Sequence, residues 1–98
     1  MSFEVIAQIS ILDYIQPGFF PRMATGARPV IRYEGMVGAS CILDLGIKGE
    51  AFVGETIEVT ISFLNPELHR ELMHVGLEFG LYSANIKLAN GKIDALLG

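Results

Sequence analysis

Apolar and polar residues alternate along most of the chain, which is the pattern of half-buried β-strands. Between residues 56 and 63 every second position is apolar, and the positions between them are polar or charged. Glycines interrupt the pattern at turns such as Gly35 and Gly54. Asn90-Gly91 is compatible with a two-residue hairpin turn or with a glycine kink inside one strand. The alternating runs, which predict about six strands, are 3–11, 30–33, 40–45, 56–63, 75–82 and 86–97.

Only one segment carries helical signals. Asn65 is a suitable N-cap, Pro66 suits the first helical position, and Glu67 complements the helix dipole. We therefore expect at most one short helix, near residues 66–73. Strands at this spacing favour a small antiparallel barrel or sandwich. Closure into a barrel suits so apolar a chain because it removes exposed strand edges.

The length of 98 residues leaves room for one core, so residues 1–98 form a single domain. The composition is 51% hydrophobic and 18% charged, with a mean hydropathy of +0.46, which excludes disorder. A single cysteine cannot form an internal disulfide, so the fold has no covalent cross-link of its own.

The formal net charge is −4, from 7 Lys and Arg against 11 Asp and Glu. This balance argues against a general nucleic-acid coat and against a binder of anionic membranes, because both need positive charge. The first residues lack the basic start and apolar run of a secretory leader. No run of about 18 apolar residues occurs either. We therefore expect a cytoplasmic protein that does not contact membranes.

A more specific pattern is the segment 26–33, which reads Gly-Ala-Arg-Pro-Val-Ile-Arg-Tyr. It resembles the Gly-aromatic-Arg-Pro-x-aromatic segment in the C-terminal barrel of elongation factor Tu and related translational GTPases. Further segments resemble that domain in the same order along nearly the whole chain. They are 3–5 (its opening strand), 19–20 (an aromatic pair), 54–61 (its Gly-Asp/Glu strand), 65–66 (its His-Pro), 76–81 (its Gly-Leu-Arg-Phe) and 90–93 (its closing Gly-Val-Val strand). The resemblance implies a closed six-stranded antiparallel barrel.

Several features of that family are missing. No Gly-x-x-x-x-Gly-Lys-Ser/Thr loop occurs, so we expect no P-loop nucleotide binding. In the family an Arg-Glu-Gly-Gly-Arg-Thr-like segment helps to hold the T-stem of tRNA. The aligned residues 82–87 have neither its arginines nor its glycines, and Ala27 replaces the aromatic residue after Gly26. The resemblance therefore implies the fold but not the tRNA-binding role.

The residues that could carry chemistry are scattered. His69 and His74 are five positions apart, a spacing that does not converge on a metal in a helix or a strand, so we expect two loop or surface histidines. Cys41 lies on the same predicted strand face as Leu43 and Leu45, where a small buried side chain is expected. Glu67 and Glu71 would lie on an exposed helix edge, which offers no pair of contrasting environments for acid–base catalysis. We expect no enzymatic activity, no cofactor and no bound metal.

Two groups of residues are candidates for binding. Arg22, Arg28 and Arg32 could contact phosphate or carboxylate groups, including those of RNA, or could tie loops together within the fold. The second group consists of apolar residues in or beside the two long loops, 21–25 and 68–75. These residues could form a partner-contact patch or fold back over the barrel end. They are Phe19, Phe20, Met23, Leu72 and Met73.

These features favour a non-enzymatic binding module whose partner is a protein. One alternative is weak RNA binding, for which three arginines on phosphates predict a salt slope of about −2 to −3. Another is a small acidic inhibitor or immunity protein that masks a basic toxin or nuclease. The apolar content also predicts a homodimer that covers part of the surface, unless the long loops cover those faces within one chain.

Overall fold

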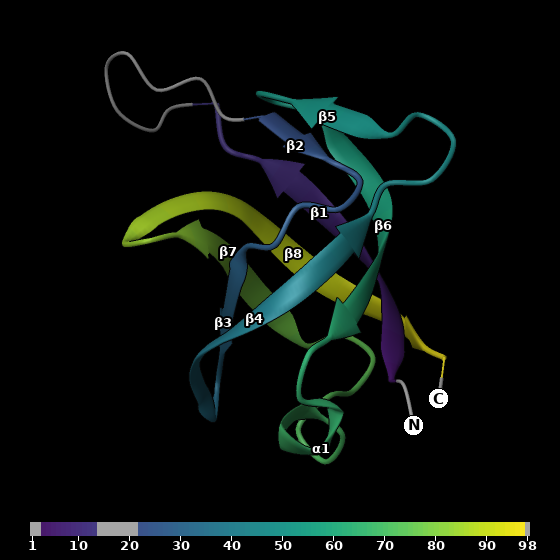
Figure 1. Ribbon diagram of the computed structural model, residues 1–98, viewed down its shortest axis with the longest axis vertical. Coiled ribbons are helices and arrows are strands. Elements are labelled where there is room, and N and C mark those ends of the chain that lie inside the picture. The colour runs from purple at the N-terminus through teal and green to yellow at the C-terminus, as the bar shows by residue number, and fades with distance from the viewer. Residues whose placement is uncertain (1–2, 14–21, 98) are drawn as a thin grey trace.

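The computed structural model describes residues 3–13 and 22–97, apart from the side chains of Arg22 and Val37. Eight strands and one short helix follow one another along this part of the chain (Figure 1). Their bounds are β1 Glu4–Ile11, β2 Arg22–Ala24, β3 Val30–Tyr33, β4 Met36–Asp44, β5 Glu50–Phe52, β6 Thr56–Phe63, α1 Pro66–His69, β7 Glu78–Ser83 and β8 Ile86–Leu96. The fold is therefore all-β, as the alternating pattern predicts.

Six of these strands close into an antiparallel barrel. Around the barrel the order is β1-β6-β4-β3-β7-β8, and β8 pairs with β1 to complete it. The predicted closed six-stranded barrel is thus confirmed. Each barrel strand is paired on both sides, so these strands present no unpaired edge to another chain.

The core fills the inside of the barrel. In β1 the alternate residues Val5, Ala7 and Ile9 are fully buried, and Ile9 lies opposite Ile57 of β6. Burying one large apolar side chain contributes roughly 1.5–3 kcal/mol, so the inward row of each strand is a major source of stability. The other barrel strands contribute the buried side chains Ile31, Cys41, Leu43, Val59, Ile61, Phe79, Leu81, Ala89 and Ile93.

Strand β8 runs through Asn90-Gly91 without a turn. Gly91 lies opposite Phe79 of β7, and the phenyl ring occupies the space where a side chain at Gly91 would be. A Cβ atom built on Gly91 would lie 2.2 Å from Cζ of Phe79. Of the two expectations for this dipeptide, the glycine inside one strand is therefore the correct one. The ring of Phe79 fits there because Gly91 has no side chain.

A second sheet, of two strands, lies at one end of the barrel (top of Figure 1). Strands β2 and β5 pair antiparallel, with Met23 opposite Ala51, and both of these side chains are buried. The alternating pattern does not predict this sheet, because runs of three residues are too short to show a period.

The chain between β6 and β7 also differs from expectation. Helix α1 ends at His69, earlier than the predicted region near 66–73. Strand β7 begins at Glu78 instead of residue 75, because Gly76 adopts φ +91°, which breaks the extended backbone. Val75 consequently lies outside the strand and is exposed. No helix in the described part of the chain is long and apolar enough to cross a membrane.

Candidate functional site

The segment 64–75 lies across one end of the barrel and contains α1 (bottom of Figure 1). Pro66 occupies the first helical turn, where the missing N–H removes no intrahelical hydrogen bond. The N–H of Arg70 donates to the carbonyl of Pro66, and that of Met73 donates to the carbonyl of His69, both at 3.0 Å. The backbone therefore keeps helix-like turns as far as Met73, and residues four apart share a face. His69 and Met73 form the inner face, and both are buried.

His69 joins this segment to the barrel. Its side chain is fully buried, its ring stacks on Phe63 with centroids 4.1 Å apart, and a 2.6 Å hydrogen bond joins its Nδ1 to the hydroxyl of Tyr33. Its Nε2 has no hydrogen-bond partner among the described residues. Burial lowers the pKa of His69, because the charged form would lose its hydration. The expectation of two loop or surface histidines is therefore right for His74, which is exposed, and wrong for His69.

Arg70 makes a second connection between α1 and the barrel. Its Cζ lies 5.1 Å from the ring centroid of Phe3, just before β1, and its Nε lies 3.6 Å from Oε1 of Glu67. The ring of Phe3 in turn stacks on Phe63, with centroids 5.7 Å apart. The inner side of the segment is thus held by aromatic contacts to two strands of the barrel.

The outer side of the same segment exposes several large apolar side chains. We call the side chains of Leu64, Leu68, Leu72 and Val75 the leucine surface; they are 50%, 52%, 37% and 64% exposed. Leu68 and Leu72 are neighbours because they are four residues apart on the helix-like turns. Leu72 also contacts the β3–β4 turn, since a Cβ atom built on Gly35 would lie 3.4 Å from its Cδ2. Of these four residues only Leu72 is among the partner contacts predicted from the sequence, although the spacing 64, 68, 72 is visible there.

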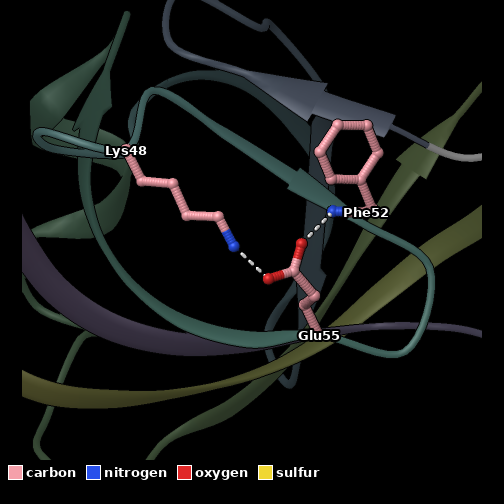
Figure 2. Close-up of polar contacts among 3 residues, drawn as sticks. All are labelled: Lys48, Phe52 and Glu55. Atoms are coloured by element: carbon pink, nitrogen blue, oxygen red, sulfur yellow. Dashed lines mark hydrogen bonds and ion pairs between the residues drawn. The ribbon is translucent and has the colours of Figure 1, made fainter.

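The opposite end of the molecule carries a second group of exposed apolar residues, Ile47, Phe52 and Val53. Figure 2 shows the polar contacts that hold this end together. The carboxylate of Glu55 accepts a hydrogen bond from the ammonium of Lys48 and another, of 2.9 Å, from the N–H of Phe52. The hydrogen bond from Lys48 lowers the pKa of Glu55 most, and the one from Phe52 lowers it further. Ile47 adjoins Lys48 in the loop and projects fully into solvent.

Arg32 is a predicted anion contact that is partly engaged within the fold. Its guanidinium lies over the ring of Tyr82, with Cζ 4.3 Å from the centroid. The ring of Tyr82 covers Gly80, where a Cβ atom would lie 2.7 Å from its Cε1. Arg32 also passes over Gly38 on the other neighbouring strand, where a Cβ atom would lie 3.8 Å from its Nε. Two glycines thus leave room for the stacked pair on the outside of the barrel.

Arg28 is exposed and makes no ion pair or hydrogen bond with another residue in the described ranges. Lys87 lies opposite Tyr82 on β8, which adds a cation to the same outer region. The side chain of Arg22 is outside the described residues. Arg28 borders a shallow pocket of about 270 Å³, lined also by Met23, Ala27, Pro29, Val30, Tyr82, Ser83, Ala84 and Leu88.

The predicted partner-contact residues have three different outcomes. Leu72 is exposed and belongs to the leucine surface. Met23 and Met73 are 3% and 5% exposed and pack in the core, so they fold back under the barrel ends and cannot meet a partner. Met23 is covered because β2 pairs with β5, and Met73 because it shares the inner face with His69. Phe19 and Phe20 lie outside the described residues.

The described residues include no group of His, Cys, Asp and Glu side chains that could hold a metal ion. Cys41 is fully buried, and burial raises the pKa of its thiol to about 12, so it is an unreactive core residue. A groove of about 420 Å³ lies over β1, β6, β7 and β8 on the outside of the barrel. It is lined by Gln8, Ser10, Thr56, Glu78, Phe79, Asn90, Gly91 and Lys92.

No known protein-family model matches this chain, and no curated protein matches it either.

Proposed function

We propose that this protein is a non-enzymatic module that binds another protein through the leucine surface. The observation that carries the proposal is that one twelve-residue segment, 64–75, exposes four large apolar side chains. Single exposed apolar residues are common on protein surfaces, whereas a cluster of large ones marks an interaction site. The inner side of the segment is held by His69 and Arg70, so the surface is presented on a fixed support.

The filled barrel supports a surface role as well. Its interior is occupied by buried side chains, and small barrels of this kind leave no chamber for a ligand. Buried groups such as Cys41 and His69 cannot reach a substrate without opening the fold. Binding through the outer surface therefore requires no rearrangement of the core.

The test is capture of proteins from cell lysate by the immobilised chain, with two matched variants. Leu68→Ser combined with Val75→Ser removes the most exposed part of the leucine surface, and Ile47→Ser removes an exposed apolar side chain at the opposite end. We expect a protein that is recovered by the native chain and by Ile47→Ser, and lost with the double variant. Recovery of RNA alone, or a protein recovered equally by all three chains, contradicts the proposal.

RNA binding is a second candidate function, supported by the outer region that carries Arg28, Arg32 and Lys87 around the ring of Tyr82. Cations beside an aromatic ring suit phosphates and bases. The test is a tRNA mobility shift at low and moderate salt, with Arg28→Ala plus Arg32→Ala as the variant. A salt-sensitive shift that the variant abolishes supports this function, and a shift that persists in the variant contradicts this site.

We also propose that the chain is a relative of the C-terminal barrel of elongation factor Tu. The closed six-stranded antiparallel barrel agrees with the fold that the resemblance implies. The two longest resembling segments lead into barrel strands of this chain, 26–33 into β3 and 54–61 into β6. An experimental structure of this chain superposed on that barrel is the test, and a different strand order or connection would contradict the relationship.

A further inference from the structure

We infer that the leucine surface receives a cationic amphipathic segment of another protein, with apolar side chains on one face and Lys or Arg beside them. The inference rests on the proposed protein-binding function and adds the chemistry of the partner. It follows from the charges around the leucine surface, taken together with its apolar character.

Three exposed carboxylates lie in the segment 64–75 or in the turn beside it. Glu67 and Glu71 alternate with Leu68 and Leu72 on the outer side of the segment, and both are exposed. Glu34 is exposed beside Gly35, in the β3–β4 turn that contacts Leu72.

The cation of this segment is paired with Glu67 and not with Glu34 or Glu71. Arg70 is the only Lys or Arg between residues 64 and 75. Its guanidinium lies over the ring of Phe3, and its Nε lies 3.6 Å from Oε1 of Glu67. Glu34 and Glu71 form no ion pair with any other residue that the structure describes. The side chain of His74 is exposed.

This arrangement favours a cationic partner over a second copy of the chain. Two copies meeting at this surface would bring the carboxylates of Glu34, Glu67 and Glu71 from both copies together, on a protein of net charge −4. Like charges facing each other oppose association, whereas a positive rim on the partner favours encounter and sets its orientation. An acidic partner is disfavoured for the same reason. The apolar side chains provide affinity, and the carboxylates favour a partner of positive charge.

The probes for the test are three synthetic 18-residue peptides added to the isotope-labelled full chain and followed by amide NMR. The first carries Leu on one helical face and Lys on the other. The second has Glu in place of every Lys, and the third has Ser in place of every Leu. We expect the Leu/Lys peptide to shift the amide signals of 64–75 and of the β3–β4 turn. We expect binding about fivefold or more weaker for the other two peptides, as the loss of several rim charges or of the apolar contact implies.

Variants of the chain separate the two contributions. Glu67→Lys with Glu71→Lys reverses the charge beside the leucine surface. It should weaken binding of the Leu/Lys peptide and strengthen binding of the Leu/Glu peptide. Leu68→Ser with Val75→Ser should weaken both. Asp13→Lys with Glu58→Lys, an equal change of charge at two exposed positions outside 64–75, is the control and should preserve the preference for Leu/Lys.

The outcomes also distinguish this inference from the proposed function. If the Leu/Glu peptide binds the native chain as tightly as the Leu/Lys peptide, protein binding stands and the cationic partner is overturned. If the third peptide, with Ser in place of Leu, binds as tightly as the Leu/Lys peptide, the segment attracts charge alone. Both the proposed function and the cationic amphipathic partner are then overturned. If no peptide shifts 64–75, the inference is overturned, and if the chain instead self-associates through these residues, the occupant is a second copy.

Discussion

The burial of His69 predicts that a single histidine sets the pH dependence of stability in mildly acidic solution. In the folded chain the imidazole is fully buried between Phe63 and Tyr33, and its pKa is lowered by that burial. In the unfolded chain it titrates near its ordinary value of about 6.5. The unfolded state therefore binds more protons as the pH falls below that value.

The sign and the size follow from this difference. Above about pH 6.5 both states are neutral at His69 and the full stability is present. As the pH falls toward the folded pKa, stability is lost with a slope that approaches about 1.4 kcal/mol per pH unit for one proton. Below the folded pKa the contribution of His69 becomes constant. The lowered pKa of Glu55 acts in the same direction in a more acidic range, so it does not obscure the window below pH 6.5.

The assay is urea unfolding followed by circular dichroism between pH 8 and pH 5. His69→Phe is the informative variant, because a phenyl ring preserves the stack on Phe63 and cannot titrate. At pH 8 it should be less stable than the native chain by about 1–3 kcal/mol, since the buried hydroxyl of Tyr33 loses its partner. Between pH 6.5 and pH 5 its stability should change much less, so the gap between the two chains should narrow.

His74→Phe is the matched control, because it replaces the exposed histidine and keeps His69, so the pH dependence that His69 causes should remain. Equal pH dependence in the native chain and in His69→Phe would refute the reasoning. So would an NMR titration in which His69 of the folded chain takes up its proton near pH 6.5.

Three further predictions concern the core and the surface. Gly91→Ala should destabilise the fold by about 1–3 kcal/mol or more, because its Cβ would lie 2.2 Å from Phe79, and combining it with Phe79→Leu should cost less than the sum of the two changes in urea unfolding. Cys41, whose pKa is raised to about 12, should fail to react with a thiol reagent at pH 8 until urea unfolds the chain, and rapid reaction in the native state would contradict its burial. The homodimer that the composition predicts should give twice the 10.7 kDa mass in light scattering at micromolar concentration and weaken with Ile47→Ser, since the carboxylates disfavour the leucine surface for self-association; a constant mass near 10.7 kDa contradicts it.

Much of the barrel can be predicted from local patterns of apolar and polar residues in the sequence. A residue in a paired strand points either inward or outward, so the alternation in 56–63 is enough to place Val59 and Ile61 in the core. The burial of Cys41 follows in the same way from its apolar neighbours in the alternation. Pro66 marks the start of α1 because its ring suits the first helical turn. These features depend on residues close in sequence, and so they can be predicted from the sequence.

The features of the candidate site depend on residues that are distant in sequence. His69 looks like a surface residue locally, and its burial needs Tyr33, which is 36 positions away, together with Phe63. Arg32 and Tyr82 meet only because β3 pairs with β7 and leaves Gly80 beneath the ring. The short strands β2 and β5 exist because they pair with each other, and neither has a period of its own. Local alternation determines which side of a strand is apolar, whereas closure of the barrel determines which side chains become neighbours, because it joins segments that the sequence keeps apart.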